Sequence, residues 1–266
     1  MITSLSNSKI KTIRKLKDRK ARESAGLFFV EGVRIVGEAL EENWQINQAI
    51  IAPELIRDGY SQELVQKLYS NDVDILEVSS QVFQSLSLKE GPKGIAAVIQ
   101  QKWADPNLLL QKPGLFVALD RIQDHGNLGT IMRTADAVGV NGIYLLDEST
   151  DPFDIATIRA SMGAIFNMPV IRMTSQKFVK LVQDNDIFLV GTSDRGAVDY
   201  QTINYPQKMV LLMGSEREGL TDSLMDACSA LVYLPMIGKS DSLNLAIATG
   251  VSLYEIYNQF RKKEGL

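Results

Sequence analysis

Residues 231–257, LVYLPMIGKSDSLNLAIATGVSLYEIY, are expected to form a strand, a loop and a long helix in direct succession. The apolar run at the start ends at Pro235, which predicts a buried strand that stops there. Apolar side chains then recur at helical spacing over residues 243–254, so an amphipathic helix should follow, with Asp241 or Ser242 as its N-cap. A strand end, a loop and a helix N-terminus gather free backbone groups, and α/β proteins bind ligands at such places. An ordinary helix cap without a ligand is the competing interpretation.

The chain before this stretch alternates strands with helices from residue 115 onward. The expected strands cover residues 115–120, 143–146, 170–171, 187–192 and 209–213. The expected helices cover residues 128–138, 155–166, 175–183 and 221–227. Such alternation predicts an α/β domain with a mostly parallel sheet and helices on both faces.

The first hundred residues predict a second, smaller α/β domain with three layers. Its expected strands cover residues 27–30, 46–52, 74–78 and 94–99, and its expected helices cover residues 31–40, 61–70 (capped by Ser61) and 82–86. The segment QKWADPNLLLQKPG that follows has two prolines and a glycine, a composition typical of a linker. We therefore expect a first domain over residues 1–103, a linker over 104–114 and a second domain over 115–266.

Composition limits the classes of protein that this chain can belong to. With 266 residues, 45% of them hydrophobic, it can bury a substantial core. Its one cysteine, Cys228, excludes an intrachain disulfide framework, and its one histidine, His125, leaves too few ligands for a Cys/His zinc site. No apolar run is long enough to span a bilayer and the N-terminus has no signal-peptide core, so we expect a cytoplasmic protein with no membrane contact.

Charge is distributed unevenly along the chain. Residues 1–22 contain eight basic residues and one acidic residue, which gives them a net charge of +7. Because the whole chain has a net charge of −4, residues 23–266 together carry −11. A basic arm on an acidic body indicates a polyanionic partner that binds at one end, although a solvated helix face explains the pattern equally well. Ile10, Ile13 and Leu16 form a thin apolar stripe, which predicts that the arm is helical and docked.

Three loops at the carboxyl ends of expected strands are rich in polar residues and cover residues 120–133, 213–220 and 234–244. In parallel sheets these ends form the ligand crevice. Each loop alone has an ordinary explanation. Arg133 could pair with Asp136, Glu216 could only cap nearby N–H groups, and His125 could be a hydrogen-bonding loop residue. All three loops together, in this order, favour a site.

The motifs LDRIQDHGNLGTIMRTADAVG (119–139), LLMGSEREGL (211–220) and LPMIGKSDSLNLAIATGVSLYE (234–255) resemble the three signature motifs of the SpoU (TrmH-type) RNA ribose 2′-O-methyltransferases. These enzymes belong to the SPOUT superfamily. The resemblance implies a trefoil-knotted methyltransferase domain with a parallel sheet, one of the rare true knots. It also implies a homodimer and S-adenosylmethionine as methyl donor. Residues 1–100 resemble, more loosely, the family's RNA substrate-binding domain, which has an L30e-like fold.

The resemblance also carries over functional residues by position. Those matched to the catalytic site are Asn127, Arg133, Glu216, Ser242 and Asn244. Those matched to the cofactor pocket are Gly214, Leu234 and Leu243, with Met236 and Thr192 as further candidates. The chain departs from the pattern at His125, where the family usually has proline, and at Ala246, where many members have serine.

These residue types suit the reaction. The ribose 2′-OH must lose a proton as it attacks the methyl group in line, and a cation aimed at that oxygen stabilises its developing charge. Arginine is effectively always protonated, so we assign Arg133 to oxyanion stabilisation rather than to general base catalysis, with a phosphate or water as proton acceptor. Asn127, Ser242 and Asn244 would position the ribose, and no metal is required.

The leading interpretation is methylation of structured RNA, with ribosomal RNA favoured over transfer RNA because of the two-domain layout. A catalytically inactive RNA-binding dimer of the same fold is the second interpretation, and the intact matched residues argue against it. A nucleotide-dependent enzyme of ordinary Rossmann type is the third. No G-x-G-x-x-G follows an expected strand, which counts against that class.

Overall fold

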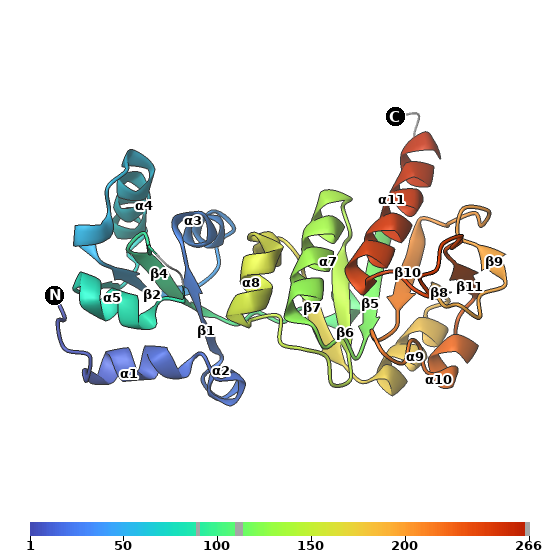
Figure 1. Cartoon of the computed structure of the whole chain (residues 1–266), viewed down its shortest axis with the longest axis horizontal. Coiled ribbons are helices and arrows are strands. Elements are labelled where there is room, and N and C mark those ends of the chain that lie inside the picture. The colour runs from blue at the N-terminus through green and yellow to red at the C-terminus, as the bar shows by residue number, and fades with distance from the viewer. Residues whose placement is uncertain (89–90, 110–113, 264–266) are drawn as a thin grey trace. The chain divides into compact units, whose positions relative to one another are not determined.

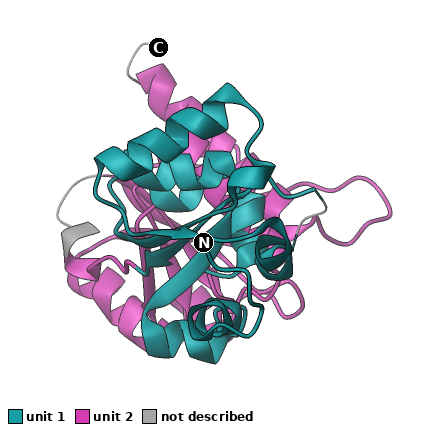
Figure 2. Cartoon of the chain, turned by 90° about the vertical axis from the view of Figure 1, so that its left-hand side faces the viewer, with its two compact units in different colours: residues 1–101, 153–166 teal, residues 102–152, 167–266 magenta. Residues whose placement is uncertain are grey.

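The computed structural model describes residues 1–88, 91–109 and 114–263 (Figure 1). The chain forms two compact units, coloured separately in Figure 2. Unit 1 comprises Met1–Gln101 and Phe153–Phe166, and unit 2 comprises Lys102–Pro152 and Asn167–Leu266. Of the expected linker, residues 104–109 are described and include the short helix α6 (Pro106–Leu109), whereas residues 110–113 lie outside the described residues.

Unit 1 contains a four-stranded sheet in the order β1-β4-β2-β3. Its strands are β1 (Leu27–Glu31), β2 (Ile46–Ile51), β3 (Ile75–Glu77) and β4 (Ile95–Gln100). β4 runs antiparallel to both β1 and β2, and β2 runs parallel to β3. The helices α3 (Val33–Glu41), α4 (Gly59–Ser70) and α5 (Ser80–Leu86) connect these strands, as the sequence predicts. Asp58, not Ser61, caps α4: the helix begins two residues earlier than expected, and the Asp58 carboxylate accepts a hydrogen bond from the Ser61 N–H.

The basic arm folds into α1 (Ser8–Lys15) and α2 (Arg19–Ala25). Ile10, Ile13 and Leu16 are buried in the core of unit 1 together with residues of β1–β4 and α5. The expectation of a helical, docked arm is therefore confirmed.

Residues 153–166 pack in unit 1 although they lie between two strands of the unit 2 sheet. They form α8 (Ile155–Ser161) and the 3-10 turn η2 (Ala164–Phe166), which are separated by Met162 and Gly163, both at positive φ. The single helix expected over 155–166 is therefore interrupted. Phe153 packs against Phe28 with ring centroids 4.9 Å apart.

Unit 2 contains a seven-stranded sheet in the order β7-β6-β5-β10-β8-β11-β9, with neighbouring strands parallel. Its strands are β5 (Gly114–Asp120), β6 (Gly142–Leu146), β7 (Val170–Met173), β8 (Phe188–Thr192), β9 (Val198–Asp199), β10 (Lys208–Met213) and β11 (Ala230–Tyr233). Burial on both faces explains the nearly continuous apolar runs in β5, β6 and β10. The expected α/β class and parallel sheet are confirmed, and the threading of the chain through a knot stays a prediction.

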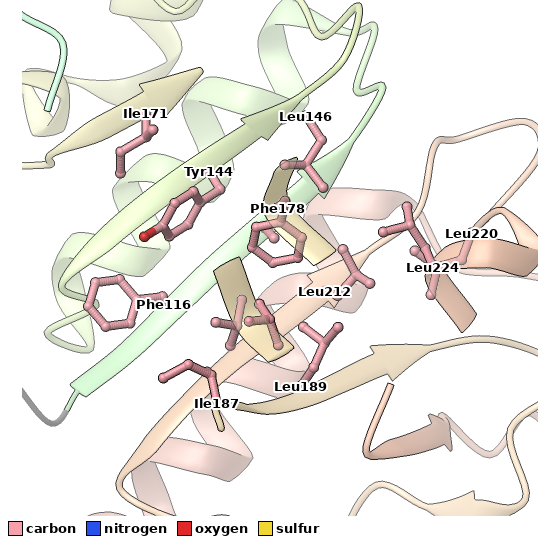
Figure 3. Packing of buried hydrophobic residues seen from close by; sticks show 13 residues of the cluster. Phe116, Tyr144, Leu146, Ile171, Phe178, Ile187, Leu189, Leu212, Leu220 and Leu224 are labelled. Carbon is pink, nitrogen blue, oxygen red and sulfur yellow. The ribbon is translucent and has the colours of Figure 1, made fainter. Parts of the chain in front are cut away.

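Helices cover both faces of this sheet (Figure 1). α9 (Ser175–Asp184) and α10 (Asp222–Asp226) pack on one face, where Phe178 and Leu224 join side chains from β5, β6, β8 and β10 (Figure 3). On the other face α7 (His125–Ala137) packs against α11 (Leu245–Lys263). The short strand β9 was not expected from the sequence.

Candidate active site

The three polar loops follow β5, β10 and β11 at the carboxyl edge of the unit 2 sheet, as the sequence predicts. Because the sheet is parallel, these strand ends share one edge. β5 and β10 are direct neighbours, so the first two loops lie side by side. α7 begins within the first of these segments, at His125, so that only residues 121–124 of it form a loop, and α11 begins directly after the third.

Glu216 joins the second loop to the first. Its carboxylate accepts hydrogen bonds from the backbone N–H groups of Gln123 (3.2 Å) and Asp124 (3.3 Å). It also accepts from the side-chain Nδ2 of Asn127 at 3.1 Å. With three N–H donors directed at it, this carboxylate organises the first loop and is a poor candidate for a general base.

Asn127 in turn joins the first loop to the third. Its Oδ1 accepts a hydrogen bond from Nδ2 of Asn244 at 3.0 Å. Oδ1 of Asn244 accepts from the backbone N–H groups of Ala246 (2.9 Å) and Ile247 (3.2 Å), so Asn244 caps α11. Three of the five residues matched to the catalytic site therefore form one continuous chain of hydrogen bonds, Glu216–Asn127–Asn244.

The N-cap predicted for this helix was wrong. α11 begins at Leu245, so Asp241 and Ser242 lie outside the helix, in the exposed loop. Both residue types are good caps, and local propensity alone does not tell them from Asn244. No hydrogen bond of the Ser242 side chain is found among the described residues, so the structure does not bring Ser242 into the chain of hydrogen bonds.

Arg133 lies on the exposed face of α7, beyond the turn that carries Asn127. Within the part of the chain that the structure describes, Arg133 forms no ion pair with Asp136, so the helix-surface pair considered from the sequence is not found there. Burial raises the pKa of the Asp136 carboxyl. The side chain of Arg133 is exposed on α7, six residues after Asn127.

Sequence analysis did not identify Arg121, which forms ion pairs near the Glu216 end of the Glu216–Asn127–Asn244 chain of hydrogen bonds. Arg121 Nη1 donates to Glu218 Oε2 at 2.6 Å, and Nη2 pairs with the buried Asp120 at 3.2 Å. Burial raises the pKa of Asp120, and the hydrogen bond from Arg121 opposes that shift. Arg121 thus connects the end of β5 to the second loop at a point two residues from Glu216. A cavity of about 450 Å³ opens there, lined in part by Arg121, Glu218, Ser193 and Arg195.

The residues matched to the cofactor pocket lie around the same edge. Thr192 ends β8 and donates to the sulfur of Met213 at 3.3 Å. Leu234 is half-buried, whereas Met236 and Leu243 remain 39% and 38% exposed. Ile237, which the sequence analysis did not single out, is fully exposed between them.

Gly214 has a structural reason to be glycine that the sequence does not reveal. A Cβ atom at this position would lie 2.2 Å from the carbonyl carbon of Gly219 and 2.4 Å from the nitrogen of Leu220. The second loop folds back on itself so tightly that a side chain has no room. A substitution there would distort the loop itself, and is not a specific test of cofactor binding.

His125 is the first residue of α7 and makes a side-chain hydrogen bond. Its Nε2 lies 2.9 Å from Oγ1 of Thr150, in the segment that follows β6. No group of three or more residues able to hold a metal ion is found among the described histidine, cysteine and acidic residues. No helix in the described residues is long and apolar enough to cross a membrane.

The basic residues of the arm divide into two groups. The three arginines contact protein: Arg14 donates to Ser85 at 3.0 Å, Arg19 pairs with Glu23 at 3.0 Å, and the buried Arg22 pairs with Asp154 at 2.9 Å. The five lysines are all exposed, namely Lys9, Lys11, Lys15, Lys17 and Lys20. The five lysines and Arg19, which is exposed although paired with Glu23, are the charges that a polyanion can reach.

Comparison with known proteins gives matches over both parts of the chain. Residues 114–254 match the model of the SpoU rRNA Methylase family, and residues 7–97 match the MRM3-like substrate binding domain. The 23S rRNA (guanosine(2553)-2′-O)-methyltransferase RlmP of Bacillus subtilis is 29% identical over 255 residues, which are 96% of this chain and 98% of the relative.

Solved structures match over the same length. The AdoMet-bound rRNA methyltransferase from Sinorhizobium meliloti is 36% identical with a TM-score of 0.88, and the match covers 98% of this chain and 97% of that one. The SpoU methyltransferase AviRb from Streptomyces viridochromogenes, in complex with AdoMet, is 28% identical with a TM-score of 0.88, covering 96% and 98%.

Proposed function

The chain belongs to the SpoU rRNA methylase family, and from this premise we propose that it transfers the methyl group of S-adenosylmethionine to a ribose 2′-OH of ribosomal RNA. The observation that carries the proposal is the chain Glu216–Asn127–Asn244, which joins the three polar loops at one edge of a parallel sheet. RlmP and the Sinorhizobium meliloti enzyme, which both match over nearly the whole chain, are named as rRNA enzymes, which favours ribosomal over transfer RNA. As expected from the sequence, we place the reaction in the cytoplasm.

Asn127 and Asn244 orient the ribose. Each side-chain amide carries two N–H donors, and the chain of hydrogen bonds uses one of them in each residue. The remaining N–H groups can donate to ribose oxygens, with Ser242 as a third polar contact from the exposed loop. Because Glu216 and the N-terminus of α11 fix both amides, the ribose meets donors that need little reorganisation.

Arg133 stabilises the charge that develops on the 2′ oxygen during attack. Its side chain is exposed and makes no ion pair within the described residues, so its charge is available to substrate. Arginine side chains are in general fixed cations in proteins, which suits Arg133 to stabilise negative charge rather than to take the proton.

S-adenosylmethionine, when bound, supplies an electrophilic methyl group on its sulfonium. The loop that contains Leu234, Met236 and Leu243 fits an adenosyl group, because it presents Met236, Ile237 and Leu243 to solvent and such apolar side chains favour a covering ligand. Gly214 and Thr192 complete the pocket through backbone and side-chain contacts at neighbouring strand ends.

A second copy of the chain covers one face of α11. Ile247, Val251 and Tyr254 recur at positions i, i+4 and i+7 and are 55%, 37% and 54% exposed. An apolar stripe of this kind on a well-packed helix is typical of a self-association surface. The proposed homodimer would bury it.

Unit 1 binds the RNA. We propose the boundaries expected from the sequence, with residues 1–103 as an RNA-binding domain, 104–114 as linker and 115–266 as methyltransferase domain. The match of residues 7–97 to a substrate binding domain supports this assignment. The five exposed lysines of the arm would contact phosphates and add affinity without sequence preference.

Calorimetry and methyl transfer together test the proposal. The purified protein should bind S-adenosylmethionine without added metal and transfer its methyl group to ribosomal RNA. Leu243→Asp should prevent cofactor binding because it places a charge in the apolar pocket, whereas Lys239→Ala on the same loop should not. Cofactor binding without transfer to any RNA would favour the inactive RNA-binding dimer, and transfer to transfer RNA alone would contradict the proposed substrate.

A further inference from the structure

The segment 148–152, here called the strap, contacts the first loop at three places. The backbone N–H of Thr150 donates to the carbonyl of Ile122 at 2.7 Å, and Nε2 of Gln123 donates to the carbonyl of Glu148 at 3.0 Å. The third contact joins two side chains, Oγ1 of Thr150 and Nε2 of His125, at 2.9 Å.

The strap is a fixed support. Thr150 is 6% exposed and the residues on either side of it are buried. Oγ of Ser149 donates to the carbonyls of Leu146 (2.7 Å) and Leu119 (3.3 Å), which anchors the strap to the ends of β6 and β5. A side chain that bonds to the strap is therefore held relative to the sheet.

His125 occupies the first position of α7, directly after the N-cap Asp124. Proline is favoured at this position because its fixed φ suits the helix and its missing N–H is not needed there. Histidine lacks that stiffness, so the first turn of α7 must be held by something else. The Asp124 carboxylate, which accepts from the Asn127 N–H at 2.7 Å, supplies one restraint, and the hydrogen bond between the His125 ring and Thr150 supplies another.

We infer that His125 and Thr150 are positioning residues for the catalytic turn. Asn127 follows His125 by two residues and lies at the centre of the Glu216–Asn127–Asn244 chain. Movement of the first turn of α7 would displace Asn127 from both partners. The inference rests on the proposed methyl transfer and adds two positioning residues to it.

The backbone conformation at Asp124 allows a test by the substitution His125→Pro. Asp124 has φ −82° and ψ 122°, an extended conformation that a following proline permits. His125→Pro should therefore fold and stiffen the first turn through the backbone instead of through the side chain. In that background the hydroxyl of Thr150 has no ring to hold and should no longer matter.

Single-turnover methylation at saturating RNA and cofactor is measured for Thr150→Val, Thr150→Ser, His125→Pro and the double variant His125→Pro/Thr150→Val. Thr150→Val should lower the rate about three- to tenfold, the effect of losing one hydrogen bond, with cofactor Kd unchanged. Thr150→Ser should restore the rate because it keeps the hydroxyl. His125→Pro should stay active. Adding Thr150→Val to His125→Pro should not lower the methylation rate further. Thr202→Val, which removes a hydroxyl that donates to the Asp199 carbonyl elsewhere in unit 2, is the matched control.

Hydrogen exchange of the first turn of α7 provides a readout that does not depend on activity. Thr150→Val should speed exchange there in the wild-type background and not in the His125→Pro background. Equal effects of Thr150→Val in both backgrounds, or a lower Tm with no change in rate and exchange, would overturn the inference. A wild-type protein that transfers no methyl group would contradict the proposed function, while the exchange result would still decide the role of the pair.

Discussion

Replacing Asn244 by aspartate should separate the catalytic role of this residue from its structural role. Aspartate keeps the side-chain oxygen that accepts from Ala246 and Ile247, and it is as good an N-cap as asparagine. Its negative charge at the N-terminus of α11 is favourable by about 0.3–1 kcal/mol. Asn244→Asp should therefore leave the free energy of unfolding unchanged or slightly raised.

The same change should break the chain of hydrogen bonds. Aspartate has no N–H to donate, so two acceptor oxygens would face each other where Nδ2 of Asn244 now lies 3.0 Å from Asn127. If the amide of Asn127 turns over to relieve this contact, it loses its donor to Glu216, now at 3.1 Å. In both cases Asn127 loses one hydrogen-bond partner. Once bound RNA excludes water from the site, the unsatisfied polar group destabilises the complex by about 1–3 kcal/mol. That cost corresponds to a rate lowered by about 5- to 150-fold if it falls on the transition state.

Single-turnover methylation and chemical denaturation, measured on the same preparations, give the two quantities. Asn244→Ala is the matched control, because it removes the cap as well as the donor and should lose about 1 kcal/mol of stability along with activity. A wild-type methylation rate in Asn244→Asp would refute the reasoning. So would a loss of stability in Asn244→Asp as large as that in Asn244→Ala.

Other substitutions test the remaining roles assigned to this chain. Arg133→Ala should lower the single-turnover rate by about 10²–10³-fold, equivalent to ~2.7–4 kcal/mol of activation free energy, with the cofactor Kd unchanged. A near-normal rate would mean that Arg133 is a surface residue of α7 without a role in the reaction. The paired change Lys11→Gln/Lys15→Gln should reduce the salt dependence of RNA binding by about 0.7–0.9 for each phosphate that is no longer neutralised, and an unchanged slope would mean that the lysines are only solvated. Ile247→Glu should convert a dimer to monomers in sedimentation, and a persistent dimer would place the interface elsewhere. Burial raises the pKa of the Cys228 thiol to about 12, so native protein at pH 8 should resist alkylation until it unfolds, and fast labelling would contradict that burial.

Sequence alone predicts the secondary structure well where apolar periodicity is strong. β5, β6 and β10 are buried on both faces, and their unbroken apolar runs mark them clearly. The polar loops after β5, β10 and β11 follow from the same reasoning, because carboxyl ends of parallel strands collect ligand-binding residues. Asn127, Glu216 and Asn244 could therefore be assigned to one site from the sequence motifs alone.

Pairings between distant residues could not be predicted in this way. Arg121 and Glu218 are 97 positions apart, and nothing in either local pattern indicates that the two loops meet there. The contact of His125 with Thr150 is equally invisible, because it depends on the path of the strap after β6. Gly214 was assigned to cofactor approach, whereas its tightest neighbours are backbone atoms of its own loop.

The path of the chain explains a further difference. Residues 153–166 lie between β6 and β7 in sequence, and periodicity assigns them to the same domain as those strands. Their side chains instead pack in unit 1, where Arg22 pairs with Asp154 and Trp44 donates to the carbonyl of Phe166 at 2.9 Å. Removal of residues 1–100 would therefore expose Phe153 and its neighbours, and a truncation meant to isolate unit 2 has to replace this segment as well.

Methylation of a ribose 2′-OH in ribosomal RNA by this chain is tested most directly in cells. The measurement maps 2′-O-methyl positions in ribosomal RNA from cells with the protein, from cells without it, and from cells that carry Arg133→Ala. We expect a 2′-O-methyl group that disappears with the protein, returns with the wild-type chain and does not return with Arg133→Ala. Identical maps in all three kinds of cell, or a missing methyl group that proves to be on a base, would contradict the proposed reaction.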